Sequence, residues 1–169
     1  GSAPLGKSPT TAMHSLRARF RETGLLNNLW SEEHVVAKGD ANLHVYRRCR
    51  TRPVREKERP VLVLVHGSSF GALASYDLKV PGKSGYSMLD VCAGFDLDVW
   101  AIDHEGYGQS TRTQSFSDFE SCTQDLSIVA DLIERETGWS SAAYYGQSAG
   151  SLRAAHFAQR YPSRVERLV

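Results

Sequence analysis

The sequence predicts an α/β protein with a mostly parallel sheet, an antiparallel hairpin at its N-terminal side and flanking helices. Two observations lead to this fold class. From residue 60 onward, short apolar runs rich in β-branched residues alternate with segments of helical periodicity, as in parallel strands joined by helical crossovers. Before residue 60, two runs of alternating residues flank a Gly-Asp turn at positions 39–40, which is typical of a hairpin.

The composition is that of an ordinary globular domain. The chain has 169 residues, of which 41% are hydrophobic and 23% are charged, and its formal net charge is +1. This balance favours no nucleic-acid partner, and no apolar run reaches the roughly 18 residues that a membrane span needs. The scattered Cys49, Cys92 and Cys122 predict neither a disulfide framework nor a metal site. We therefore expect a cytoplasmic location, with secretion or a periplasmic location left open because Gly1-Ser2 resembles a cloning remnant.

The N-terminal part is expected to contain a tail, a helix and the hairpin. Residues 1–12 are rich in Ser, Thr, Pro and Gly and predict a disordered tail, so the domain would comprise residues 13–169. A short outer helix is expected over residues 13–22. The hairpin strands are expected at residues 33–38 and 42–47. The charged residues 47–59 predict a solvated connection, because acidic residues are interleaved with the basic ones.

The remaining elements follow in alternation. Strands are expected at residues 60–65, 99–102, 141–145 and 165–169, and the first two of them should be buried. Helices are expected at residues 87–94, between Ser117 and Gly138, and at 149–161. The middle helix should begin at a capping box formed by Ser117–Glu120 and end at Gly138. Its apolar residues fall on one face, which predicts burial: Cys122, Leu126, Val129, Ala130 and Ile133. In the last helix, Leu152, Ala155 and Phe157 are expected to pack on the sheet.

Polar residues that can support chemistry follow three of these strands. His66-Gly67-Ser68, Asp103-His104-Glu105 and Ser148 all come directly after predicted strands. Ligands of parallel α/β sheets bind at the carboxyl ends of the strands, so these segments should converge on one site. Ser148 lies in Gly146-Gln147-Ser148-Ala149-Gly150, a G-x-S-x-G pattern between a strand and a helix. Such a pattern lifts the serine onto a strained turn, where flanking glycines avoid a clash between strand and helix.

With these motifs in order, the sequence resembles the α/β-hydrolase family of serine esterases and lipases. The resemblance covers residues 33–169 and rests on the strand entering His66-Gly67, the D-x-x-G-x-G-x-S loop at 103–110 and the elbow at 146–150. It implies the N-terminal portion of that fold, with the chain ending inside the sixth family strand. A serine at the elbow argues against the epoxide hydrolases and dehalogenases of the family, whose chemistry uses an aspartate there.

The resemblance also implies roles for individual residues. Ser148 would be the nucleophile, and the backbone N–H groups of Ser68 and Ala149 would form the oxyanion hole, with Ser69 as a less favoured donor. We expect substrate contacts from the following residues: Ser69, Phe70, Tyr107 and Gln147. Structural roles near the site are expected for the following residues: His66, Gly67, Asp103, Gly146 and Gly150. Adjacent turn residues point apart, so a relay between His104 and Glu105 is not expected.

The chain departs from the family pattern after Ser148. The family places the acid and then the histidine on later strands, but only Glu166 and His156 follow Ser148 here. His156 lies two helical turns away, or about 12 Å along the axis, and cannot reach the serine hydroxyl. The base and acid are therefore expected from sequence beyond Val169, in a longer chain or in a complementary C-terminal polypeptide.

These residues predict a serine hydrolase that cleaves a carboxylic ester or a related small-molecule acyl compound through an acyl-enzyme, without a cofactor or metal. The same machinery serves acyltransferases, amidases and carbon–carbon hydrolases, which stay open as alternatives. A further alternative of another class is an inactive fragment or scaffold that a second polypeptide completes.

Overall fold

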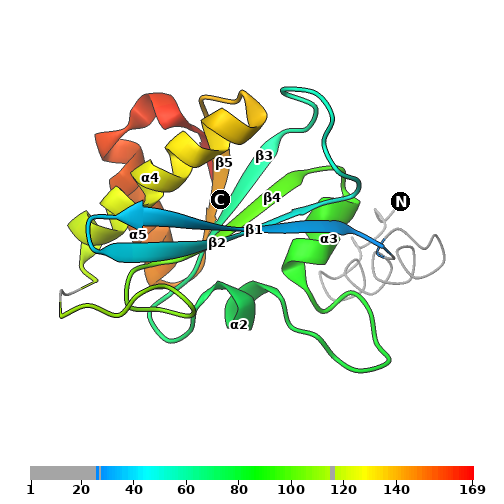
Figure 1. Cartoon of the computed structure of the whole chain (residues 1–169), viewed down its shortest axis with the longest axis horizontal. Helices are drawn as coiled ribbons and strands as arrows, with labels where there is room; N and C mark the ends of the chain where they lie inside the picture. The colour runs from blue at the N-terminus through cyan, green and yellow to red at the C-terminus, as the bar shows by residue number, and fades with distance from the viewer. Residues whose placement is uncertain (1–25, 27, 115–116) are drawn as a thin grey trace, which may run out of the picture.

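The computed structural model describes residues 26, 28–114 and 117–169, and its centre is one mixed sheet (Figure 1). The expected tail at 1–12 and helix at 13–22 lie outside these residues. The sheet has six strands in the order β1-β2-β4-β3-β5-β6. Their bounds are β1 Trp30–Lys38, β2 Ala41–Cys49, β3 Val61–Val65, β4 Asp98–Asp103, β5 Ala142–Gly146 and β6 Val165–Leu168. β1 and β2 form the predicted antiparallel hairpin, β2 is antiparallel to β4, and the other pairs are parallel.

Helices cover both faces of the sheet, which confirms the predicted fold class. They are α2 Ala72–Tyr76, α3 Met88–Gly94, α4 Phe119–Thr137, α5 Ala149–Arg160 and the 3-10 turn η1 Pro162–Arg164. One core cluster joins the sheet to α4 and α5, and the other joins it to α2 and α3. Figure 1 shows these two pairs of helices on opposite sides of the strands. The sheet is therefore buried between two layers, as a parallel sheet requires.

The apolar strands owe their continuous pattern to this double cover. In β3, Val63 and Val65 belong to the cluster with α4 and α5, whereas Leu64 between them belongs to the cluster with α2 and α3. Neighbouring side chains of a strand point to opposite faces, so a strand covered twice must be apolar at every position. β4 repeats the arrangement, with Trp100 on one face and Ala101 on the other.

The ends of α4 bear out one prediction and shift another. Gly138 ends the helix in the left-handed conformation with φ of 76°, as predicted. The N-cap is Asp118, whose side chain accepts a hydrogen bond from the Ser121 N–H at 2.8 Å. The expected capping box starting at Ser117 is therefore displaced by one residue, because Asp118 is itself a favoured cap.

Two further expectations need correction in the helical layers. Leu152 does not pack on the sheet but is 59% exposed, and the buried face of α5 contains Arg153, Ala154 and Phe157. The short helix α2 lies at residues for which the sequence predicts no helix or strand. Its first N–H group donates to the Asp103 carboxylate at 2.6 Å, so a residue distant in sequence supports its start.

The predicted solvated connection at residues 47–59 is also only partly correct, because Arg47 belongs to β2 and is 5% exposed. Its guanidinium donates to the Asp98 carboxylate from Nε at 2.9 Å and from Nη2 at 2.6 Å. It also lies over the rings of Trp30 and Trp100. Arg47 thus joins the hairpin to β4 at the end of the sheet opposite the strand carboxyl ends.

Candidate active site

Ser148 lies on a strained turn between β5 and α5. Its backbone has φ of 55° and ψ of −125°, a combination that L-residues rarely adopt. Such a strained conformation persists only where the surrounding structure enforces it. The side chain is exposed at the carboxyl end of β5, and α5 begins at the next residue. The hydroxyl therefore stands clear of the sheet at the N-terminus of a helix.

The two flanking glycines allow strand, turn and helix to approach closely. A Cβ on Gly146 would lie 2.5 Å from Ser151 Cα, and a Cβ on Gly150 would lie 2.1 Å from the Val65 carbonyl oxygen. Both contacts are far inside van der Waals distance and involve backbone atoms that cannot turn away. The sharp turn at Ser148 thus requires glycine on both sides.

A pocket of about 310 Å³ opens beside Ser148. It is lined by Gly67, Ser68, Ser69, Phe70, Ala74, Ser75, Gln147 and Ser148. The loop after β3 forms one wall, and it comes so close to the elbow that a Cβ on Gly67 would lie 3.3 Å from Ser148 Cβ. The structure therefore brings Ser69, Phe70 and Gln147 to the pocket together with Ser148.

Two backbone N–H groups at this pocket have no acceptor. Neither the Ser68 N–H nor the Ala149 N–H donates to a group of the described residues. Ala149 is the first residue of α5, where N–H groups have no partner within the helix. Such free donors favour a negatively charged oxygen nearby.

Asp103 holds two loops at the rim of the site. Its Oδ1 accepts from the Ala72 N–H at 2.6 Å, and its Oδ2 accepts from the Gln109 N–H at 2.9 Å and the Tyr46 hydroxyl at 2.8 Å. The carboxylate is 1% exposed. Asp103 thus connects the two loops by accepting an N–H group from each.

His66 is a buried, neutral hydrogen-bonding residue beneath the loop after β3. Its Nε2 accepts from the His104 N–H at 3.1 Å, so Nδ1 carries the proton and donates to the Gly67 carbonyl oxygen at 2.6 Å. Burial and the neighbouring His104 lower the pKa of His66 to about 4. The imidazole therefore supports the loop, and both of its nitrogens are occupied by hydrogen bonds to the backbone.

The guanidinium of Arg153 lies on the same loop, and sequence reasoning missed it. Its Nη1 donates to the carbonyl oxygens of His66 at 2.9 Å and Gly67 at 3.1 Å. It also lies over the ring of Tyr107, with 5.2 Å between guanidinium carbon and ring centroid. A signal existed, because Gly150 must face the sheet and position 153 is on the same helical face.

Tyr107 contacts the residues that support the loop after β3. Its ring packs on His66 and on Arg153, and it is not among the residues that line the pocket beside Ser148. The expected substrate contact from Tyr107 stays a prediction.

A buried charged cluster lies behind this layer. His104 Nδ1 is 3.0 Å from Asp125 Oδ2, and Lys38 Nζ is 2.5 Å from Asp125 Oδ1 and 2.8 Å from Glu105 Oε2. Burial alone would lower the pKa of His104, but interactions with Asp125 and Cys122 raise it. His104 thus faces α4, and neither it nor Glu105 lines the pocket of Ser148.

The same cluster contains the described residues that could offer ligands to a metal. One ligand atom each of His104, Cys122 and Asp125 lies within 4.8 Å of the others. Sequence spacing did not suggest this group because it combines a loop with a helix further along the chain. The Lys38 ammonium is already bound to Asp125 and places a positive charge where a cation would bind. The arrangement fits a hydrogen-bonded ion network better than a metal site.

One histidine and one carboxylate follow Ser148 in the sequence, and they lie on α5 and β6. His156 Nδ1 is 2.7 Å from Thr123 Oγ1 on α4, and its ring lies near that of Phe119. Glu166 is exposed on β6. Within residues 26, 28–114 and 117–169, no histidine or carboxylate is hydrogen-bonded to the Ser148 hydroxyl.

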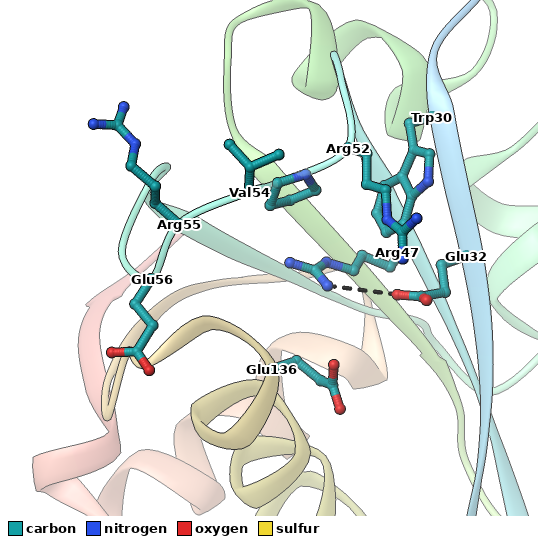
Figure 2. Close-up of a pocket in the computed structure, with 9 residues that line it drawn as sticks. Trp30, Glu32, Arg47, Arg52, Val54, Arg55, Glu56 and Glu136 are labelled. Carbon is teal, nitrogen blue, oxygen red and sulfur yellow. Dashed lines mark hydrogen bonds and ion pairs between the residues drawn. The ribbon is translucent and has the colours of Figure 1, made fainter.

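A second pocket, of about 280 Å³, lies at the opposite end of the sheet (Figure 2). It is lined by Trp30, Glu32, Arg47, Arg52, Pro53, Val54, Arg55, Glu56 and Glu136. Figure 2 shows the Arg47 guanidinium directed toward Glu32, and Asp98 binds the same guanidinium from the sheet. Acidic and basic groups are mixed around this hollow, so its lining favours no single ligand charge.

The helices that the structure describes include none with both the length and the apolar character required to cross a membrane. No curated protein sequence matches the chain. A family model described as serine aminopeptidase, S33, matches residues 88–169, which include Asp103, the elbow and α5.

Solved structures share the fold over most of the chain. A structure described as a membrane phospholipase A, a bacterial virulence factor, is 24% identical with a TM-score of 0.62, covering 95% of this chain and 44% of that protein. Epoxide hydrolase A from Mycobacterium thermoresistibile is 25% identical with a TM-score of 0.60, covering 82% and 38%. A predicted CIB-like hydrolase from Thermoplasma acidophilum is 16% identical with a TM-score of 0.61, covering 83% and 62%. The chain thus spans less than two thirds of the length of each of these proteins.

Proposed function

Since this chain has the α/β-hydrolase fold, we propose that it carries the nucleophile and oxyanion hole of a serine hydrolase that acts on a carboxylic ester or a related acyl compound. The observation that carries the proposal is the placement of Ser148. Its strained backbone directs an exposed hydroxyl to a pocket where two N–H groups lack acceptors. A nucleophile beside preorganised donors is the arrangement that acyl transfer requires.

In the proposed reaction, Ser148 Oγ forms a bond to the carbonyl carbon of the substrate. The hydroxyl proton passes to a histidine, and the carbonyl oxygen becomes an oxyanion held by the N–H groups of Ser68 and Ala149. Collapse of this intermediate breaks the ester bond, and the histidine returns the proton to the departing alcohol. Water then attacks the acyl-enzyme by the same steps, which releases the acid and restores Ser148.

The histidine and its acid partner belong, in this proposal, to sequence outside residues 1–169. The support is that His156 is bound to Thr123 on α4, that Glu166 is exposed on β6, and that the compared structures are longer. Either a longer chain or a complementary C-terminal polypeptide would add them beyond β6. Ser69, Phe70 and Gln147 would contact the acyl group, because they line the pocket.

A fluorophosphonate probe tests this proposal, because it phosphonylates only an activated serine. The full-length protein should be labelled at Ser148, Ser148→Ala should abolish labelling, and residues 1–169 alone should stay unlabelled. Ser163→Ala, an exposed serine in η1, serves as the matched control and should label like the wild type. An unlabelled full-length protein, or a Ser148→Ala variant labelled like the wild type, would refute the proposal.

A second candidate is hydrolysis of an amide bond, which the description of the matching family model as a serine aminopeptidase favours. The attack on the carbonyl carbon is the same, but the base must protonate a poorer leaving group. Comparing kcat/KM for a p-nitrophenyl ester with that for an aminoacyl p-nitroanilide separates the two. Faster turnover of the anilide would replace the ester proposal with the amidase one.

A further inference from the structure

Arg153 is a buried cation without an anionic partner. Its side chain is 3% exposed, and no carboxylate in the described part of the chain lies within ion-pair distance of it. A buried charge is costly unless its hydrogen bonds are satisfied. Here the donors are directed to backbone carbonyl oxygens of His66 and Gly67 and to the Tyr107 hydroxyl at 3.4 Å.

The carbonyl of Gly67 belongs to the peptide group whose N–H is that of Ser68. No peptide bond among the described residues is cis, so the oxygen and the hydrogen of this group point in opposite directions. Holding the Gly67 oxygen on the Arg153 side therefore directs the Ser68 N–H to the other side. His66 Nδ1 binds the same oxygen at 2.6 Å, so two donors fix one peptide plane.

Arg153 also links the two free donors of the pocket. It lies on α5, and the first residue of that helix, Ala149, provides the second N–H. The guanidinium is anchored one turn further along the same rigid helix and grips the loop that carries Ser68. Arg153, together with His66, therefore sets the position of one donor relative to the other.

We propose that Arg153 is a positioning residue for the oxyanion hole, an inference that rests on the proposed serine hydrolase function. It holds the Gly67–Ser68 peptide so that the Ser68 N–H faces the developing oxyanion. Its unpaired positive charge also polarises this peptide, which makes the N–H a stronger donor. In a buried site such preorganised charge acts most strongly on the transition state, where the oxygen is anionic.

The test uses the full-length protein with a p-nitrophenyl ester and three variants. Arg153→Met removes the charge and the hydrogen-bond donors, whereas Arg153→Lys keeps the charge but loses the planar set of guanidinium N–H donors. The control Arg160→Met removes an exposed arginine of the same helix. We expect kcat to fall about 100-fold in Arg153→Met with KM changed less than about threefold, because the lost interaction belongs to the transition state. Arg153→Lys should recover part of the loss, and Arg160→Met should stay within about twofold of the wild type.

A second readout separates positioning from general loosening of the fold. The inhibition constant of a trifluoromethyl ketone, which forms an oxyanion with Ser148, should rise in proportion to the loss of kcat/KM across the variants. Binding of a non-reactive alcohol analogue should change little. An equal rise for both compounds, or unchanged kcat in Arg153→Met, would overturn the inference.

Folding is checked by circular dichroism at the assay temperature. If Arg153→Met does not fold, Arg153→Lys decides, and wild-type kcat with wild-type ketone affinity in that variant would overturn the positioning role. Failure of the proposed function is visible separately, because the wild type itself would then resist the fluorophosphonate and both ideas would fall. A labelled wild type with unaffected Arg153 variants removes only the present inference.

Discussion

At the scale of single residues, the site depends on His66 staying neutral. Its Nε2 must accept from the His104 N–H while Nδ1 donates to Gly67, and a protonated ring could not accept. The pKa of about 4 lies below the ordinary value of 6.5, because burial disfavours the imidazolium. Protonation therefore favours the unfolded state, so the contribution of His66 is complete above pH 6.5 and is lost as the pH falls toward 4.

We predict that this residue accounts for about 2 kcal/mol of the fall in unfolding free energy between pH 7 and pH 4.5. Urea unfolding of wild type and His66→Gln at both values measures it. His66→Gln should be less stable at neutral pH but should lose correspondingly less on acidification. An identical fall in unfolding free energy in the two proteins would show that protonation of His66 does not cause the loss of stability in acid.

Some single residues of the candidate site could be predicted from the sequence, and others could not. The elbow at Ser148 was predictable because strand, glycines and helix are adjacent along the chain. Arg153 was not predicted, because an arginine in a helix is ordinarily exposed and its acceptors, the carbonyls of His66 and Gly67, lie far away in sequence. Tyr107 was expected to contact substrate, and its ring packs on His66 and Arg153.

At the scale of elements, the start of α4 gives a clear prediction. Asp118 accepts from the Ser121 N–H and places a negative charge at the helix N-terminus, so Asp118→Ala should cost about 1 kcal/mol of stability. The neighbouring Ser117→Ala is the matched control and should cost less than about half as much. Urea unfolding measures the free energy of unfolding of both variants. A larger loss in Ser117→Ala than in Asp118→Ala would mean that Ser117 is the N-cap of α4.

Elements were predicted well where they are long and periodic, and poorly where tertiary contacts decide. The strands and the helices α3, α4 and α5 follow from apolar spacing and from caps such as Gly138. The helix α2 has only five residues, and its first N–H group donates to the distant Asp103 carboxylate. No local sequence pattern therefore predicts this helix. The same limit applies to the buried face of α5, where Arg153 rather than Leu152 is covered.

At the scale of the whole molecule, the Arg47–Asp98 pair joins the antiparallel hairpin to the parallel part of the sheet. Both side chains are almost fully buried, with exposed fractions of 5% and 4%. Arg47→Met would leave a buried carboxylate unpaired, and we predict a loss of about 3–5 kcal/mol. The double variant Arg47→Met with Asp98→Leu should lose less, because it leaves no unpaired charge.

The exposed pair Arg164–Asp131 provides the comparison, since Asp131→Ala should cost less than about 1 kcal/mol. Thermal or urea unfolding of all the variants gives the required free energies. A double variant as unstable as Arg47→Met alone would mean that the contribution comes from packing against Trp30 and Trp100 instead.

The Asp103 carboxylate binds both the loop after β3 and the loop after β4, and this limits how the pocket can be altered. A Cβ on Gly71 or on Gly108 would lie within 2.5 Å of the Asp103 carboxylate, so both loops are held at contact distance by one side chain. Residues 68–71 therefore cannot be lengthened or exchanged independently of residues 106–109. Transplanting a pocket from a homologous protein should succeed when the two loops are transferred as a pair with Asp103, and fail when either is moved alone.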